Sequence, residues 1–221
     1  VLIVDLDSQA NTTSGMGLLP HRLEKTVYDA LVGRCTGEDA IKKTALLSVD
    51  ILPASTALAG ANIELVDIPN REYKLKEILE PLRRRYDFII IDSAPSVGLL
   101  TINALTLAGK VIIPVQCEYY ALEGLADLLR TIQLINANLK ARVSVMGALL
   151  TMYDRKSRLH RAVAKEIRRK FPGYVFGAVI PRNVSLAEAP SFGKTILQYD
   201  PYSHGAKAYR QLAQEILKLE G

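Results

Sequence analysis

Short apolar runs rich in β-branched residues alternate along the chain with longer segments of helical period. The runs that predict strands are 1–5, 51–54, 88–92, 111–115, 143–151 and 174–180. The segments that predict helices are 26–32, 55–66, 72–85, 98–108, 121–138, 158–171 and 206–219. Strands that are apolar on both faces and separated by helices are typical of a parallel sheet covered on both sides. The pattern predicts one doubly wound, mostly parallel α/β domain spanning 1–221.

Composition narrows the class of protein. The chain has 221 residues, of which 49% are hydrophobic, and no run approaches the ~20 continuous apolar residues of a membrane span. Cys35 and Cys117 have no spacing that suits a metal, so they are predicted to be reduced thiols. We therefore expect a cytoplasmic protein without membrane partners.

Positive charge is concentrated in the second half of the chain. The net charge is +5, and residues 111–221 carry 16 basic and 9 acidic side chains, against 12 and 14 in residues 1–110. This asymmetry is compatible with a polyanionic partner.

Polar residues follow four of the predicted strands. Asp5-Leu6-Asp7 ends the first, Asp92-Ser93 the third, Gln116-Cys117-Glu118 the fourth and Pro181-Arg182-Asn183 the sixth. Ligands of open parallel sheets bind beyond the carboxyl ends of the strands, so these residues form the predicted site.

Three of these residues are carboxylates suited to phosphate chemistry. An apolar strand that ends on an aspartate, as 88–92 does on Asp92, is how P-loop NTPases hold a magnesium ion. Asp5 and Asp7 point to the same side of their strand, so one could order the metal shell while the other orients a water. The alternative is that Asp92 caps a helix and that Asp7 only ends a strand.

Four sequence blocks resemble one known family. Val-Asp-Leu-Asp-Ser-Gln-Ala-Asn-Thr-Thr-Ser-Gly-Met-Gly at 4–17 is similar to a signature of the ParA/Soj partition ATPases, with Ser8 in place of proline and Ala10 in place of glycine. The segment that begins Asp92-Ser-Ala-Pro-Ser resembles the Walker B region of the family. Pro114-Val-Gln-Cys-Glu-Tyr-Tyr-Ala-Leu-Glu-Gly-Leu and Ile180-Pro-Arg-Asn-Val-Ser-Leu-Ala-Glu-Ala-Pro-Ser-Phe-Gly-Lys match two further blocks. We expect Ser8 and Ala10 to be tolerated because both are small.

The resemblance implies roles for individual residues. Asp7 would activate the attacking water, and Asp5 and Asp92 would belong to the magnesium environment. The residues Pro181, Arg182, Asn183 and Val184 would lie against the adenine, and the segment Gln116 to Tyr120, with Gln116 and Glu118, would lie beside the nucleotide and the dimer interface. The cofactors would be ATP and Mg²⁺.

The resemblance also implies a working cycle. ATP would drive a homodimer that binds nonspecific DNA on the nucleoid, and a ParB/Spo0J-type partner would stimulate hydrolysis. The cargo would be a chromosome or a plasmid.

The phosphate-binding loop of that family does not occur in the 221 residues. The family opens with a strand, a Lys-Gly-Gly-x-Gly-Lys-Thr loop and a helix, which we expect to lie upstream of Val1, so that this chain is truncated. Gly193-Lys194-Thr195 reads like the end of such a loop, but Pro190 interrupts it and Ile196-Leu197 predict a strand rather than a helix.

One predicted helix is strongly basic. Its apolar stripe, formed by Leu159, Val163, Ile167 and Phe171, should dock on the sheet. Basic side chains occupy the other faces of 155–170 and are predicted to bind DNA phosphates without sequence readout: Arg155, Lys156, Arg158, Arg161, Lys165, Arg168, Arg169 and Lys170. The alternative is a solvated helix face.

Two other functions are compatible with the sequence. One is a catalytically inactive module that keeps the DNA face without a nucleotide site. The other is a MinD-like membrane-positioning ATPase, which the mixed charges of the last helix, with Arg210 and Lys218 beside Glu215 and Glu220, do not favour.

Overall fold

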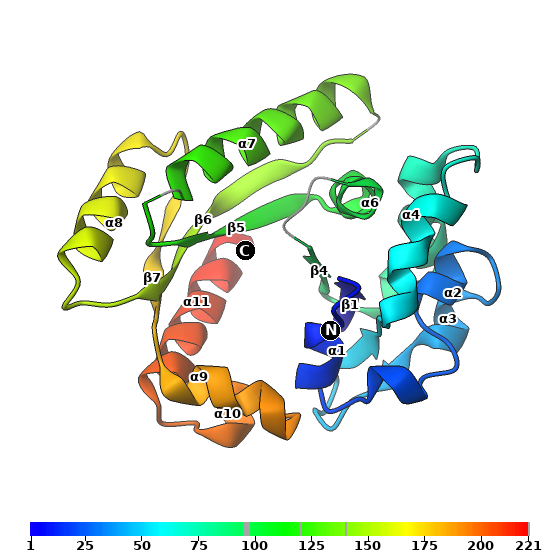
Figure 1. Cartoon of the computed structure of the whole chain (residues 1–221), viewed down its shortest axis with the longest axis horizontal. Helices are drawn as coiled ribbons and strands as arrows, with labels where there is room; N and C mark the ends of the chain where they lie inside the picture. The colour runs from blue at the N-terminus through cyan, green and yellow to red at the C-terminus, as the bar shows by residue number, and fades with distance from the viewer. Residues whose placement is uncertain (95–97, 120, 140, 221) are drawn as a thin grey trace. The chain divides into compact units, whose positions relative to one another are not determined.

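The computed structural model describes residues 1–94, 98–119, 121–139 and 141–220, so Pro95, Ser96 and Tyr120 of the sequence blocks lie outside the described residues. The chain divides into two compact units (Figure 1). Unit 1 comprises Val1–Ala108, Ile135–Arg142 and Pro190–Gly193, and unit 2 comprises Gly109–Leu134, Val143–Ala189 and Lys194–Gly221.

The sheet of unit 1 has the strand order β2-β3-β1-β4. Strands β1 (Leu2–Leu6), β3 (Asp50–Leu52) and β4 (Ile89–Ser93) are parallel, and they lie close to the predicted runs at 1–5, 51–54 and 88–92. The short strand β2 (Lys42–Lys43) is antiparallel to β3 and was not predicted, because two lysines form no apolar run.

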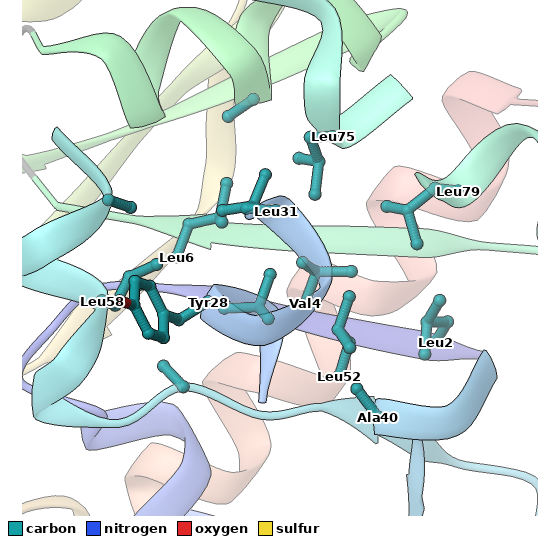
Figure 2. Close-up of a cluster of buried hydrophobic side chains, with 14 of the residues drawn as sticks. Leu2, Val4, Leu6, Tyr28, Leu31, Ala40, Leu52, Leu58, Leu75 and Leu79 are labelled. Carbon is teal, nitrogen blue, oxygen red and sulfur yellow. The ribbon is translucent and has the colours of Figure 1, made fainter. Parts of the chain in front are cut away.

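Alternation along β1 separates the core from the polar site. Leu2, Val4 and Leu6 are at most 1% exposed and pack among residues such as Leu52 and Leu79 (Figure 2). Because successive side chains of a strand point to opposite faces, Asp5 leaves this cluster on the other side.

The helices of unit 1 include two that the sequence did not predict, at 11–15 and 37–40, and the others are shorter than predicted. They are α1 (Asn11–Gly15), α2 (Val27–Leu31), α3 (Gly37–Ala40), α4 (Ala61–Glu64), α5 (Lys74–Leu79) and α6 (Leu99–Leu107). The predicted helices 55–66 and 72–85 are each broken by 3-10 turns, at Thr56–Gly60, Arg71–Tyr73 and Glu80–Arg85. Pro81 lacks the N–H that a continuous α-helix needs, which accounts for the last of these breaks.

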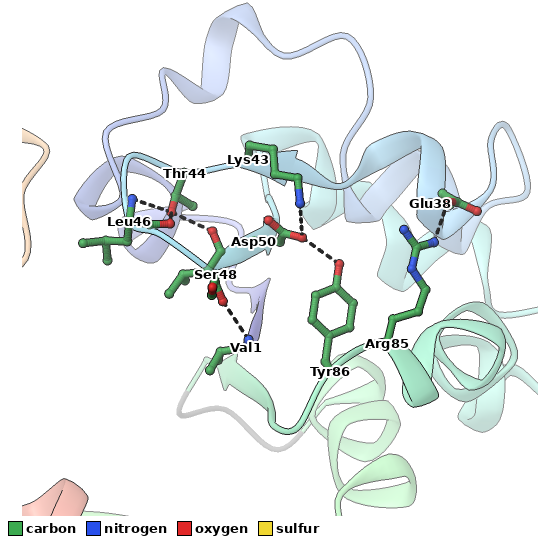
Figure 3. A network of polar contacts seen from close by, with 10 residues as sticks. Val1, Glu38, Lys43, Thr44, Leu46, Ser48, Asp50, Arg85 and Tyr86 are labelled. Carbon is green, nitrogen blue, oxygen red and sulfur yellow. Dashed lines mark hydrogen bonds and ion pairs between the residues drawn. The ribbon is translucent and has the colours of Figure 1, made fainter.

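A polar network at Asp50 fixes the end of β3 (Figure 3). Asp50 Oδ2 accepts hydrogen bonds from Lys43 Nζ and Tyr86 Oη, each at 2.9 Å. Burial, together with this contact to Asp50, raises the pKa of Tyr86 to about 12. The phenol therefore stays a hydrogen-bond donor throughout the neutral range.

The sheet of unit 2 has the strand order β5-β6-β7 and is entirely parallel. Its strands are β5 (Lys110–Gln116), β6 (Ser144–Tyr153) and β7 (Val175–Pro181), close to the predicted 111–115, 143–151 and 174–180. Phe176, Ala178 and Ile180 of β7 pack with Leu149 and Leu212 in a separate core.

The helices of unit 2 include two that the sequence did not predict. Helices α8 (Arg158–Lys170) and α11 (His204–Glu220) were expected, as was α7 (Ala121–Asn138), whose last residues are grouped with unit 1. The additional helices are α9 (Val184–Glu188) and α10 (Ile196–Tyr199). The strand expected at Ile196-Leu197 is wrong, because Thr195 and Gln198 form a capping box that starts α10.

Helix α11 closes one edge of the second sheet. The carboxylate of Glu215 accepts hydrogen bonds from the backbone N–H groups of Gly177 (2.7 Å) and Ala178 (3.0 Å) and from the Tyr174 hydroxyl. β7 is an edge strand, so this side chain occupies donors that another strand could otherwise pair with.

β4 departs from the burial that its sequence predicts. Its apolar pattern is that of a strand covered on both faces, yet Ile90 is 56% exposed. Within the described residues, β4 pairs only with β1, so it is an edge strand of its sheet.

No helix in the described part of the chain is long and apolar enough to cross a lipid bilayer.

Candidate functional site

Three predicted carboxylates meet at the carboxyl-terminal rim of the first sheet. Asp5 and Asp92 are register partners in the parallel pair β1–β4. Asp7 follows two residues after Asp5, and its backbone N–H donates to Asp5 Oδ1 at 3.1 Å. The structure therefore brings Asp5, Asp7 and Asp92 together at one rim.

Asp5 is enclosed by hydrogen-bond donors. It is fully buried, and its Oδ2 accepts hydrogen bonds from the backbone N–H of Thr13 (2.8 Å) and from the Thr13 hydroxyl (2.7 Å). Burial raises the pKa of Asp5, while the bonds from Thr13 and Asp7 act in the opposite direction. This geometry makes Asp5 an anchor for α1 and for the backbone that carries Asp7.

Asp92 lies in a different environment from its register partner. It is exposed, and its Oδ2 accepts a hydrogen bond from the Thr12 hydroxyl at 2.6 Å. Asp7 is half-buried, and its Oδ1 accepts from the backbone N–H of Gln9 at 2.9 Å. Asp92 and Asp7 are thus the carboxylates that solvent reaches.

The turn between Asp7 and α1 contains a strained backbone position. Ala10 has φ 52° and ψ 36°, in the left-handed region, and its N–H donates to the Asp7 carbonyl at 2.9 Å. This turn directs the chain into α1, so that Thr12 and Thr13 face the two aspartates. Glycine adopts such a conformation without steric cost, which gives a physical reason for the glycine usual at this position.

The carboxylates fit a magnesium ion that keeps most of its water. In the described residues, no three His, Cys, Asp or Glu side chains form a group that could hold a metal by themselves. Mg²⁺ in phosphate sites is commonly held by one or two carboxylates together with waters and phosphate oxygens. The exposed carboxylate of Asp92 suits that arrangement.

A backbone contact holds the other end of α1 within unit 1. Gly17 and Gly193 both have positive φ, 83° and 60°, and a Cβ at Gly193 would lie 2.8 Å from the Cα of Gly17. A Cβ at Gly17 would lie 3.1 Å from the Gly193 carbonyl oxygen. The segment 190–193 therefore packs directly on the turn that follows α1.

The predicted nucleotide-binding residues, Gln116 and the adenine segment 181–184 among them, lie at or directly after strand ends of unit 2. Gln116 and Pro181 are the last residues of β5 and β7. Asn183 caps α9, and its Oδ1 accepts a hydrogen bond from the backbone N–H of Leu186 at 3.1 Å, which leaves its NH₂ group for other contacts. Val184 is 72% exposed.

An ion pair between Glu118 and Arg182 connects two of these strand ends. The guanidinium of Arg182 lies 3.8 Å from Glu118 Oε1, and the backbone N–H of Arg182 donates to the Tyr153 carbonyl at 3.0 Å. His160 Nε2 lies 3.7 Å from the same carboxylate oxygen.

Helix α8 presents its basic residues to solvent, as the sequence predicted. The exposed ones are Arg155, Lys156, Arg158, Arg161, Lys165, Arg168, Arg169 and Lys170. Several are also tied within the protein: Arg161 donates to the Arg155 carbonyl at 2.7 Å, and Arg168 to the Phe176 carbonyl at 3.2 Å.

An acidic residue neutralises the last turn of α8. Arg169 and Lys170 both pair with Glu166, at 2.9 and 2.7 Å. Hydrogen bonds from these two residues lower the pKa of Glu166 to about 2.

The predicted apolar stripe of α8 is wrong at one position, Leu159. Val163, Ile167 and Phe171 are buried, but Leu159 is 44% exposed, and His160 takes the buried place instead. His160 Nδ1 accepts a hydrogen bond from the backbone N–H of Asp154 at 2.9 Å. This bond holds the first turn of α8 in the rotation that buries His160 and exposes Leu159.

Sequence reasoning missed three residues of these sites. Thr12 and Thr13 stand within the block 4–17, directly after the carboxylates, and their hydroxyls at the start of a helix were the available signal. For His160, the sequence showed no comparable signal, because its contacts come from the ends of two other strands.

Comparisons with known proteins agree with the fold and the motifs. A family model described as an AAA domain matches residues 1–145. The chain is 50% identical over 216 residues to the sporulation initiation inhibitor protein Soj of Bacillus subtilis, which covers 98% of this chain and 85% of that protein. It is 44% identical over 222 residues to the chromosome partitioning protein ParA of Caulobacter vibrioides, with 100% and 83% covered.

Solved structures show the same architecture. Cobyrinic acid a,c-diamide synthase from Mycobacterium smegmatis, with bound ATP analog and magnesium, is 34% identical with a TM-score of 0.87, covering 98% of this chain and 81% of that one. The septum site-determining protein MinD from Pyrococcus horikoshii, complexed with Mg-ADP, is 27% identical with a TM-score of 0.79, covering 100% and 84%. The predicted P-loop NTPase-like fold is thereby confirmed.

Proposed function

This chain belongs to the ParA/Soj family of partition ATPases, and from that premise we propose that it is an ATPase that segregates replicated chromosomal or plasmid DNA. The observation that carries the proposal is the meeting of Asp5, Asp7 and Asp92 at one strand-end rim. Carboxylates at such a rim serve phosphoryl transfer by positioning metal and water.

The three carboxylates divide the work according to their surroundings. Asp7, which solvent reaches, orients the attacking water. Asp92 lies on the metal side, with Thr12 holding one of its oxygens. Asp5 contributes to the magnesium environment from within, because its three hydrogen bonds keep Asp7 and α1 in place. A bound Mg²⁺ would supply charge neutralisation for the phosphates.

The strand ends of unit 2 carry the proposed contacts to the base. Pro181 and Val184 offer apolar surface to the adenine, and the Asn183 NH₂ offers a donor to its ring nitrogens. Gln116, Glu118 and Arg182 lie beside them at the same edge of the sheet. The proposal also includes a homodimer and a ParB/Spo0J-type partner, which only membership of the family supports.

The basic face of α8 is the proposed surface for nonspecific, nucleoid-associated DNA. A short helix with many exposed cations and no acidic residue in its first two turns attracts a polyanion regardless of sequence. The structure suggests which residues to test, because Arg161 and Arg168 also stabilise the protein through carbonyl contacts.

The test is the salt dependence of binding to a nonspecific DNA duplex, measured by fluorescence anisotropy. Arg158→Ala with Lys165→Ala removes two exposed cations that have no described partner within the protein. Each lost phosphate contact reduces the slope of log K against log salt by about 0.9, so the double variant should flatten it by roughly 2.

A matched control removes equal charge elsewhere. Arg83→Ala with Arg84→Ala lies in the exposed 3-10 turn of unit 1 and should leave the slope unchanged. If both double variants lower the slope equally, binding follows net charge and α8 is not the DNA surface. If the unmodified chain shows no binding at low salt, the DNA part of the proposed function is wrong.

A further inference from the structure

Two side chains from separate elements of unit 2 converge on one carboxylate oxygen of Glu118. Glu118 follows β5, His160 lies in the first turn of α8, and Arg182 follows β7. Glu118 Oε1 lies 3.7 Å from His160 Nε2 and 3.8 Å from the Arg182 guanidinium. The end of β5 is thus connected to both the basic helix and the segment 181–184.

His160 fixes the start of α8 from two sides. Its side chain is 10% exposed, and its Nδ1 accepts from the Asp154 N–H, so the ring proton is on Nε2, the nitrogen that faces Glu118. Its own backbone N–H donates to the Ser157 hydroxyl, which caps the helix. Any shift of the imidazole therefore moves the first turn of α8, which carries Arg158 and Arg161.

Arg182 fixes the other end of the arrangement. Its backbone N–H bonds to the Tyr153 carbonyl, the last residue of β6, and its guanidinium reaches Glu118. The next residue, Asn183, caps α9. A ligand that displaced Arg182 would leave the Glu118 carboxylate facing the Nε2 atom of His160.

We propose that Glu118 is a positioning residue that couples the segment 181–184 to the basic helix α8, with Arg182 and His160 as its two contacts. The ligands at the two ends, a nucleotide and DNA, rest on the proposed function. The coupling between Arg182 and His160 is a property of the chain itself and is tested without either ligand.

The readout is the imidazole of His160 in long-range ¹H–¹⁵N NMR spectra. The chain has 3 histidines, so the ring signals of His160 are assignable from a His160→Gln variant. Arg182→Ala should shift the Nε2 signal of His160, because the two side chains share a contact with Glu118 and the substitution keeps the backbone N–H of residue 182. In a Glu118→Gln background, the same Arg182→Ala change should leave that signal in place.

Matched variants distinguish coupling through Glu118 from a general effect of charge. Arg210→Ala removes another exposed arginine of unit 2, which donates to the Pro201 carbonyl, and should leave the His160 signals unchanged. Arg182→Lys keeps the charge and should restore most of the original shift. The proposal is overturned if Arg182→Ala does not move the His160 signal, or moves it equally in the Glu118→Gln background.

DNA supplies the second arm. Coupling is reciprocal, so adding a DNA duplex should shift the guanidinium signal of Arg182 in the wild-type chain and not in Glu118→Gln. Affinity for DNA should change by roughly fivefold or more between wild type and Glu118→Gln. If the chain binds no DNA, the DNA part of the proposed function is wrong, and the histidine spectra still test the coupling through Glu118. If DNA shifts the Arg182 signal equally in both proteins, only the coupling is wrong.

Discussion

At the scale of single residues, Ala10 carries a backbone strain that bears on the carboxylate site. Its φ of 52° places an alanine Cβ in the left-handed region, at the turn between Asp7 and α1. Such a conformation costs a non-glycine residue roughly 1–2 kcal/mol. The strain is held by the Ala10 N–H bond to the Asp7 carbonyl and by the packing of a residue that is 1% exposed.

Replacing Ala10 by glycine should therefore stabilise the protein. The relief of strain exceeds the ~0.5–1 kcal/mol of extra backbone entropy that glycine loses on folding, which leaves a gain of up to about 1 kcal/mol. Urea unfolding measures it. Ala137→Gly, at an exposed position of α7, is the control and should destabilise by about 0.5–1 kcal/mol. A destabilised Ala10→Gly variant would show that the turn is not strained.

The sequence predicted which carboxylates meet but not how they differ. Strand ends and alternation were enough to bring Asp5, Asp7 and Asp92 to one rim. The burial of Asp5 and the exposure of Asp92 depend on Thr13 and Thr12, which reach them from a five-residue helix too short to show a period. Local patterns do not contain that tertiary information.

At the scale of elements, the contact of α11 with β7 includes the carboxylate of Glu215, which accepts hydrogen bonds from the β7 backbone. Burial alone would raise the pKa of Glu215, but the hydrogen bonds from Tyr174, Gly177 and Ala178 outweigh it and hold that pKa below its usual value of 4.5. A carboxylate with a lowered pKa stabilises the folded state above its unfolded pKa, and this stabilisation is lost as the pH falls through the folded pKa.

We predict that Glu215→Gln lowers the free energy of unfolding by about 1–3 kcal/mol at neutral pH, because it replaces an acceptor of two backbone N–H groups. The difference from wild type should shrink as the pH falls from about 4.5, the pKa of the unfolded carboxylate, through the lower pKa of the folded one. Urea unfolding between acid and neutral pH measures it. Glu220→Gln breaks only a surface pair with Lys110 and should change little. A difference that is constant with pH would contradict the assignment.

Helix boundaries were less predictable than strands. Buried strands appear as continuous apolar runs, so the six longer predicted runs match observed strands, while the two-residue run Ile196-Leu197 lies in helix α10. Helices 55–66 and 72–85 have helical period in sequence but are partly 3-10 in the structure, since packing against the sheet and Pro81 decide the local turn. Leu159 was misplaced because the contacts of His160 set the rotation of α8.

At the scale of the whole molecule, the family and the fold were predictable because four blocks recur in order along the chain. The proposed ATPase activity rests on the family and also needs a Lys-Gly-Gly-x-Gly-Lys-Thr loop, which the 221 residues by themselves do not contain. Backbone N–H groups and lysines of such a loop neutralise the triphosphate.

We therefore predict that the purified 221-residue chain shows no saturable binding of Mg-ATP at millimolar concentration by isothermal titration calorimetry. The Mycobacterium smegmatis protein whose structure holds an ATP analog and magnesium is the positive control. Saturable, magnesium-dependent binding by the chain alone would mean that other groups bind the phosphates.

The contact between Gly17 and Gly193 limits how this protein can vary. Where two side chains meet, a larger residue on one partner is often offset by a smaller one on the other. Here a Cβ on either glycine would meet main-chain atoms of the other, so neither position has side-chain volume to give up. Each glycine is constrained by itself, and labels or cysteines for spectroscopy belong instead at a site such as Gly124, which is exposed and whose surroundings are open.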